Sequence, residues 1–222
     1  DLSSTYTFVG AAADAPAGYV VLDPNQLNSI GADSILIGGT RTASAAGSQV
    51  NVGADTVEIG AGATLTGNEV LLVAGSNLLL DAGATVQSTP SGSGSFAPLV
   101  VPTGAALLGV ANAAQDYAYS YGGYAGNVTV APGATVSGTG TVAMLSGGTF
   151  DFAGSLSAAG AQVILGATSV ALGGVPTGFA GLALTPALLD GLKAGNLQLL
   201  SPNEVQVYGS ASLDLSKLDV SA

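Results

Sequence analysis

Carboxylates are the residues of this sequence that could most readily do chemistry, because it contains 14 Asp and Glu residues but no histidine and no cysteine. The missing types exclude His-dependent catalytic triads, thiolate chemistry and disulfides. Two carboxylates held near each other can hydrolyse a glycosidic bond, one as acid and the other as base or nucleophile. Asp14, Asp23 and Asp33 lie close together in sequence, but neither an EF-hand loop nor a Gly-Gly-x-Gly-x-Asp repeat contains them. We therefore expect no metal and no other cofactor.

Tyrosines form a second candidate group. On a strand, Tyr117, Tyr119 and Tyr121 would project from one face, and Tyr124 follows after two glycines. Exposed, these rings could form an aromatic platform for a glycan or a protein partner. Alternatively they belong to a loop whose rings cover a neighbouring part of the fold, which is the interpretation we favour. Arg41, the only arginine, is expected to be a turn residue tied to a nearby acid.

A repeated element must position these residues. The stretch 57–65 is a short apolar strand, a glycine turn and the start of a second strand, and it returns at 78–86, 99–107 and 128–136. A looser copy follows near residue 154, with a turn that we expect to be one residue shorter. The turn glycines are Gly62, Gly83, Gly104, Gly133 and Gly154. The steps between them are equal, apart from a longer step between Gly104 and Gly133.

A period of about 21 residues made of strands and glycine turns is typical of a solenoid, in which stacked coils bury one another's apolar faces. The sequence therefore predicts an all-β fold, a parallel β-helix of about ten coils and on the order of 50 Å in length. Residues 1–222 would form a single domain. Two insertions interrupt the coils, a Ser/Gly-rich loop at 88–96 and the tyrosine-rich segment at 111–126.

Stacking in register predicts which residues are neighbours. One apolar row should contain Ile59, Leu80, Val101 and Val130, and another Leu65, Val86, Leu107 and Val136. Glycine suits the turns because a tight corner often needs positive φ. Asp81 would align with Gly60, Pro102, Ala131 and Phe152, and Asp151 would lie under valines and leucines. No carboxylate pair forms in this register, so we predict that the protein is not an enzyme.

The charge distribution excludes two classes of partner. The formal net charge is −11, and the only cationic side chains are Arg41, Lys193 and Lys217. Nucleic acids and anionic membrane surfaces need clustered cations, so neither is expected as a partner. The uncharged segment 96–114 contains prolines and glycines, which argues against membrane insertion.

Two short helices are expected within this β structure. Asp23 is a helix N-cap followed by Pro24 at the first helical position, and Leu27 and Ile30 give the helix an apolar side. The same unit returns near the carboxyl terminus in an alignment without gaps, where Thr185 and Pro186 repeat the cap and Leu189 and Leu192 repeat the apolar residues. We expect each helix to pack beside its coil and to shield an edge or an open end of the core.

A strand follows each helix unit, at 49–53 in the first and at 204–209 in the second. This longer period indicates a module boundary near residues 180–184. The chain begins at Asp1 without a signal peptide and ends inside its second unit, which we interpret as an excerpt of a longer array.

Three segments resemble a known family. Leu-Asn-Ser-Ile-Gly-Ala-Asp-Ser-Ile-Leu-Ile-Gly-Gly-Thr-Arg at 27–41, together with 69–86 and 197–209, is similar to very large filamentous haemagglutinin-like exoproteins. The resemblance implies a right-handed β-helix, secreted by Gram-negative bacteria through an outer-membrane partner transporter (two-partner secretion) and located at the bacterial cell surface. No counterpart of the family's amino-terminal secretion domain, with its Asn-Pro-Asn motifs, is present, and the family carries no catalytic residues onto these positions.

The function expected from these observations is structural. The chain would be a non-catalytic shaft segment of an adhesin that spaces or displays elements binding a glycan or protein receptor in adhesion or biofilm formation. One alternative is an extracellular fibre subunit that associates end to end, because open β-helix ends expose unpaired backbone. The other is a carbohydrate-active β-helix enzyme, which would require clustered acids on one solvent face.

Overall fold

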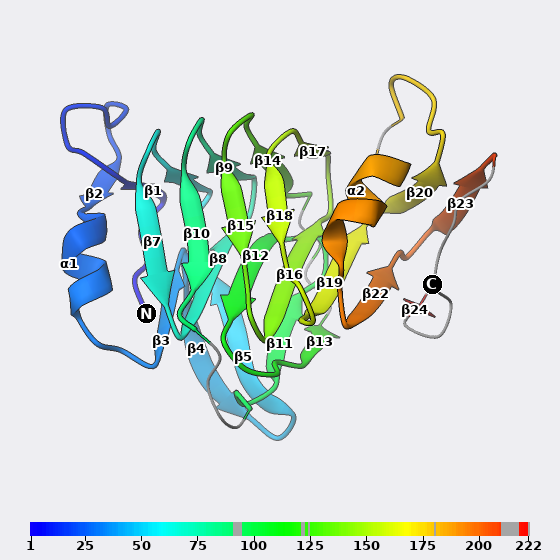
Figure 1. Cartoon of the computed structure of the whole chain (residues 1–222). Helices are drawn as coiled ribbons and strands as arrows, with labels where there is room; N and C mark the ends of the chain where they lie inside the picture. Colours follow the sequence, from blue (N-terminus) through cyan, green and yellow to red (C-terminus); the bar gives the residue numbers. More distant parts are fainter. Residues whose placement is uncertain (91–94, 121–122, 124, 180, 210–217, 222) are drawn as a thin grey trace.

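The computed structural model describes residues 1–90, 95–120, 123, 125–179, 181–209 and 218–221. The described chain is all-β apart from two short helices, and its strands lie side by side in several sheets (Figure 1). Most neighbouring strands are parallel and come from different repeats of the sequence.

Three sheets, called I, II and III here, are built from the repeats. Sheet I consists of β17 (Phe150–Phe152), β14 (Asn127–Val130), β9 (Asn77–Leu80), β6 (Thr56–Ile59), β1 (Tyr6–Val9) and β2 (Val20–Leu22), in this order. Sheet II consists of β18 (Ser155–Ser157), β15 (Thr135–Ser137), β10 (Thr85–Ser88) and β7 (Thr64–Gly67). Sheet III consists of β24 (Leu218–Ser221), β22 (Asn196–Leu200), β19 (Gln162–Ala167), β16 (Thr141–Ser146), β12 (Ala106–Ala111), β8 (Glu69–Ala74) and β3 (Ser34–Ile37).

Successive repeats contribute one strand to each of these sheets. The strands β6, β7 and β8 form one such set, β14, β15 and β16 a second, and β17, β18 and β19 a third. Leu80 pairs with both Ile59 and Val130, and Val86 pairs with both Leu65 and Val136. All of these side chains are buried in one apolar cluster enclosed by the three sheets. The predicted rows are therefore confirmed for three of the four repeats.

The copy at 99–107 does not belong to this stack, so the prediction for it was wrong. Its first strand is β11 (Leu99–Pro102), which pairs with β5 (Gly47–Val52) and β13 (Tyr117–Ser120), whereas β9 pairs directly with β14. Val101 therefore leaves the first predicted row. Leu107 leaves the second, because β12 runs antiparallel between β8 and β16 in sheet III. The segment nevertheless has the same strand–glycine–strand pattern as the other copies. Its turn joins two different layers, whereas the turns of the other copies join sheet I to sheet II.

Those layers are sheet III and a fourth sheet on its outer side. Sheet IV has the order β13, β11, β5 and β4 (Gly39–Ser44), with β4 and β5 forming an antiparallel hairpin. A second apolar cluster fills the space between the sheets, with Leu71 and Leu145 from sheet III and Val50 and Leu99 from sheet IV. Strands β8, β12 and β16 are consequently buried on both faces, which explains the continuous apolar runs at 70–74, 106–111 and 142–145.

The stack is shorter than expected. Sheet III, the longest sheet of the described chain, has seven strands. Six spacings of about 4.8 Å give about 29 Å along the stack, against the roughly 50 Å predicted from sequence. The difference arises because β4, β5, β11 and β13 lie in sheet IV, beside the stack instead of within it.

Glycines occupy the turns for two different reasons. Gly62, Gly83, Gly104 and Gly133 all have positive φ, between 70° and 84°, as predicted. Gly154 does not, and is required instead by space, since a Cβ there would lie 2.6 Å from the carbonyl oxygen of Ala134.

The turn at Gly154 is also shorter than expected. Phe152 pairs with Val130 and Leu156 with Val136, so the turn has lost two residues relative to its neighbour, not one. Each side of the glycine loses one residue. As a result Asp151 pairs with Thr129 and does not lie beneath a row of valines and leucines.

The two helices flank sheet II. Helix α1 (Pro24–Ser29) lies beside β7, and helix α2 (Pro186–Leu192) lies beside β18, so each covers one edge of that sheet (Figure 1). The predicted caps are confirmed: the Asp23 side chain accepts from the backbone N–H of Asn25, and Thr185 accepts from that of Leu188. The helices therefore shield the sheet edges, as predicted.

The side chain of Asn28 takes the place of a neighbouring strand at the edge of β7. Its Nδ2 donates to the carbonyl oxygen of Thr64 (2.9 Å), and its Oδ1 accepts from the backbone N–H of Thr66 (2.8 Å). Leu27 is buried against the core, but Ile30 is 62% exposed. The prediction that both residues form a packed apolar side of this helix is therefore confirmed for Leu27 only.

The second helix unit is accompanied by sheet V, with the order β21 (Leu182–Leu184), β20 (Ser169–Gly173) and β23 (Glu204–Tyr208). Its strand β20 lies between β21 and β23, in the way that β1 lies between β2 and β6. The strand equivalent to 204–209 is therefore β6, and not the stretch 49–53, which lies in or directly after β5. The alignment of the two helix units by sequence predicted the wrong equivalent strand, because the β4–β5 hairpin is inserted in the first unit only.

Candidate functional site

An apolar groove of about 470 Å³ lies where sheet IV ends over sheet III. Its floor crosses Val73 of β8, Leu145 of β16 and Leu200 of β22, and its wall is β11 with the turn at 103–105. Sheet III continues beyond this turn to β19 and β22, so its outer face becomes uncovered there. The groove is thus a consequence of the insertion that carries β11 and β13.

The polar groups around this groove have structural partners. The Ser146 hydroxyl donates to the carbonyl oxygen of Thr149 (2.8 Å), and the Thr168 hydroxyl donates to that of Gly147 (2.7 Å). The Ser201 hydroxyl donates to the carbonyl oxygen of Glu204 (2.7 Å). None of the described lining residues is charged. The groove can bury an apolar group, but its described residues offer no activated nucleophile, acid or base.

The predicted tyrosine surface is only partly described. Tyr117, on β13, is half-buried and packs into the cluster between sheets III and IV. Its hydroxyl oxygen lies close to Gly109 of β12: a Cβ added to this glycine would be only 2.3 Å from that oxygen. This placement agrees with rings that cover a neighbouring part of the fold. Tyr119 is also on β13, without a described side chain, and Tyr121 and Tyr124 lie outside the described residues.

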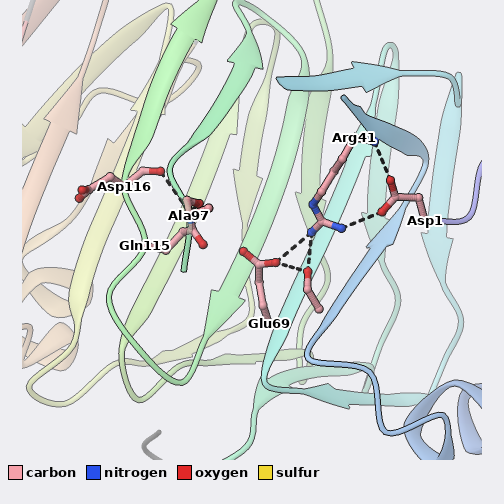
Figure 2. Close-up of polar contacts among 7 residues, drawn as sticks. Asp1, Arg41, Glu69, Ala97, Gln115 and Asp116 are labelled. Carbon is pink, nitrogen blue, oxygen red and sulfur yellow. Dashed lines mark hydrogen bonds and ion pairs between the residues drawn. The ribbon is translucent and has the colours of Figure 1, made fainter. Parts of the chain in front are cut away.

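The insertion that contains these tyrosines is anchored by Gln115. This buried side chain donates through Nε2 to the carbonyl oxygen of Ala97 (2.6 Å), as Figure 2 shows. Its backbone N–H donates to the Thr141 hydroxyl on β16 (3.0 Å). Because Gln115 connects residues on both sides of β11–β12 with the main stack, it fixes the position of the groove wall.

Two carboxyl groups do meet on the outer face of sheet I. Burial raises the pKa of Glu58 first, and the charge and hydrogen bond of Asp81 raise it further. Sequence comparison missed this pair because it considered matched register positions only, whereas Glu58 pairs with Leu79, two residues before Asp81. Tyr19 lies close by, and the pKa of its phenol is raised by burial and then by Glu58. Its ring lies 5.5 Å from that of Tyr6, centroid to centroid.

The two carboxyl groups of a glycosidase flank the scissile bond of a bound substrate. Neither Glu58 nor Asp81 lines the groove, and the raised pKa of Glu58, caused by burial and then by Asp81, is explained by two acids close together on one surface. The two acids lie on or directly after the neighbouring strands β6 and β9, and a carbohydrate-active alternative requires acids clustered on one solvent face, so these two residues are the ones to test for it.

Arg41 joins the amino terminus to sheet III (Figure 2). Its Nη1 lies 2.7 Å from Asp1 Oδ1, and its Nη2 lies 2.9 Å from Glu69 Oε2. Ser34 accepts from Nη2 (2.6 Å) and donates to the Glu69 carboxylate. Burial raises the pKa of Glu69, although Ser34 and Arg41 lower it. The prediction that Arg41 is tied to an acid is confirmed, but it lies on strand β4 and not in a turn.

Other classes of site are not supported by the described residues. Among them no group of three or more potential metal-ligating side chains occurs, and no helix is long and apolar enough to cross a membrane. Comparison of the chain with protein-family models, with curated proteins and with solved structures finds no match.

Proposed function

We propose that this chain is a right-handed parallel β-helix and a non-catalytic shaft segment of a secreted bacterial surface protein. The observation that carries the proposal is the continuous apolar core, in which rows such as Ile59–Leu80–Val130 pass from one repeat to the next. Repeats that contact only their neighbours are typical of proteins whose length and spacing are their function.

The engagement of the reactive side chains supports a structural role. Arg41 and Glu69 join the amino terminus to sheet III, and Gln115 anchors the insertion. The described residues that line the groove are all uncharged. In an enzyme of this size, at least one cluster of titratable groups would be expected to line a cavity.

The insertion with β11–β13 supports the display part of the proposal. It leaves the stack after β10, places sheet IV on the outside and creates an apolar groove walled by the turn at 103–105. We propose that this insertion is the displayed element and that its ligand is a glycan or protein receptor in adhesion or biofilm formation. Localisation at the cell surface and export through an outer-membrane partner transporter follow from the family resemblance alone.

Binding without turnover tests this function. Beads coated with the protein are presented to a panel of glycans and extracellular matrix proteins, with Leu200→Asp as the groove variant and Val207→Asp, an exposed residue of β23, as the matched control. We expect saturable binding that Leu200→Asp weakens at least about tenfold and that the control leaves unchanged. Equal binding by both variants would mean that the groove is not the displayed site.

A carbohydrate-active enzyme is the second candidate, favoured only by the contact between Glu58 and Asp81 beside two tyrosines. Release of reducing ends from common polysaccharides tests it, with Glu58→Gln and Asp81→Asn as variants. The shaft proposal expects no turnover by the wild-type protein. Turnover that either substitution abolishes would replace the structural function by a catalytic one.

A further inference from the structure

The two helix units of the chain are equivalent in three dimensions beyond the helices themselves. Thr7 of β1 pairs with Val20 and Val57, and Val170 of β20 pairs in the same way with Leu182 and Val205. The units β1–β2–α1–β3 and β20–β21–α2–β22 therefore have the same connections. From β2 onward the two units stand at one constant offset in the sequence, and before β2 that offset is longer by a single position.

The equivalence extends to the amino terminus. Leu2 forms a parallel bridge with Ile37 of β3, and Leu165 of β19 pairs with Leu199 of β22. Since Ile37 and Leu199 are equivalent at the offset that relates the two helices, Leu2 stands where Leu165 stands in the second unit. Residues 1–4 thus occupy the place of the last part of β19.

The second unit is covered on the side that faces the preceding repeat. The strands β17, β18 and β19 form this cover: β17 contacts β21, β18 contacts α2, and β19 pairs with β22 along its length. The backbone N–H of Gly160 in this repeat donates to the carbonyl oxygen of Lys193, directly after α2 (3.0 Å).

The corresponding side of the first unit has no such cover among the described residues, and its apolar residues are exposed. Ile30 is 62% exposed, whereas its equivalent Leu192 is 3% exposed. Val20 is 50% exposed, whereas its equivalent Leu182 is 1% exposed. Val20 and Ile30 form this surface, which we call the amino-terminal face.

We propose that the amino-terminal face binds one further coil of the kind formed by β17–β18–β19, joined in tandem ahead of Asp1. The occupant is specified by the second unit, where a coil of this kind buries the residues equivalent to Ile30 and Val20. The same contacts at the first unit complete the strand that the amino-terminal residues begin beside β3, where Leu2 pairs with Ile37, and they cover α1. This inference rests on the β-helix part of the proposed function and adds a specific interface between modules that repeat at the spacing of the two helices.

A tandem fusion tests the proposal. A second copy of residues 127–163 is placed directly before Asp1, so that Asp1 follows Val163 and takes the place of Ile164. The copy contains the proposed coil, β17, β18 and the start of β19, and also the preceding set β14–β16, on which this coil packs in the native chain. We expect the amides of α1 and β3 to exchange with solvent at least about tenfold more slowly than in the unextended chain. Ile30→Asp and Val20→Asp should each abolish this gain. Val207→Asp, with the same 62% exposure as Ile30 but at the opposite end, should leave it intact.

Two outcomes would overturn the proposal. In the first, the added residues remain unprotected while β6–β19 exchange as slowly as before, which means that the coil does not dock on a folded chain. In the second, the unextended chain itself dimerises in sedimentation velocity and Ile30→Asp abolishes the dimer, which means that the occupant is the end of a second chain. Neither outcome changes the tests for receptor binding or polysaccharide turnover, so failure of this interface and failure of the proposed function are distinguishable.

Discussion

The side chain of Asn28 should contribute about 1–3 kcal/mol to folding, an unusually large contribution for an exposed residue. It makes two hydrogen bonds to the edge of β7, at 2.9 Å to the carbonyl oxygen of Thr64 and at 2.8 Å from the N–H of Thr66. Each net hydrogen bond contributes about 0.5–1.5 kcal/mol. Asn28→Ala removes both, and Asn28→Asp removes the donor to Thr64 while keeping an acceptor for Thr66.

The expected free energies of unfolding therefore fall in the order wild type, Asn28→Asp, Asn28→Ala. Urea denaturation gives the magnitudes, and hydrogen exchange at the Thr66 amide locates the effect, because that amide loses its partner only in Asn28→Ala. Asn25→Ala is the matched control, since this residue is exposed on the same helix and its side chain has no hydrogen bond in the described structure. A loss below about 0.3 kcal/mol in Asn28→Ala, with unchanged exchange at Thr66, would refute the edge-capping role of this helix.

Three further predictions concern the turns, the acids and the two helix units. Gly83→Ala should destabilise the folded state by about 1–2 kcal/mol, because Gly83 has a positive φ. Gly154→Ala should destabilise it by about 1–3 kcal/mol, because the added methyl group overpacks against Ala134. Crystal structures of the variants would show a changed φ in the first and a displaced strand in the second. Burial raises the pKa values of Glu58 and Glu69 above the usual 4.5, so the folded state binds more protons than the unfolded state and stability should fall as pH rises from 4.5 through the raised pKa values. Denaturation at several pH values should show a flatter slope in Glu58→Gln and Glu69→Gln, and an unchanged slope would contradict the assignment. In the unextended chain, Leu192→Ala should lower the free energy of unfolding by about 2–5 kcal/mol and Ile30→Ala by less than about 0.5 kcal/mol, because only Leu192 is buried. Equal losses in thermal or urea unfolding would contradict the different environments of the two residues.

The local features of this fold could be predicted from sequence because they depend on a few residues. Asp23–Pro24 and Thr185–Pro186 specify helix starts through their own hydrogen bonds and fixed φ, and the turn glycines with positive φ mark corners. The apolar rows followed from equal spacing between these corners. Two corners misled the prediction: Gly104, whose flanking strands lie outside the predicted rows, and Gly154, where the turn has lost one residue on each side of the glycine.

The path of the insertion could not be predicted, because the segment 99–107 satisfies the same local pattern as a coil. One signal was available: Pro102 has no N–H to donate, which disfavours a central position in a stack. In the structure Pro102 pairs with Ser120 on one side only. A second signal was the unbroken apolar sequence of β8 and β12, since strands with one solvent face alternate between apolar and polar residues.

Among the candidate sites, the groove and the contact between Glu58 and Asp81 were missed for the same reason. Both depend on residues brought together diagonally or between layers, whereas sequence comparison aligned matched positions of successive repeats. Leu145 and Leu200, for example, lie in different repeats and line one groove only because sheet IV ends above them. Arg41 was predictable because a single arginine among 14 acids has few alternatives to an ion pair.

Cysteine cross-linking between turns tests the stacking of the coils most directly, since the chain has no cysteine of its own. Exposed turn positions Ala61, Ala82 and Pro132 lie beside Gly62, Gly83 and Gly133, whose backbones stack on one another. Neighbouring strands are about 4.8 Å apart, a separation of Cα atoms that a disulfide can bridge. We predict rapid oxidation of the pairs Ala61→Cys with Ala82→Cys and Ala82→Cys with Pro132→Cys, and none for Ala82→Cys with Thr103→Cys. Rapid cross-linking of residue 82 to residue 103, and not to 132, would contradict the stack and restore the order read from the sequence alone.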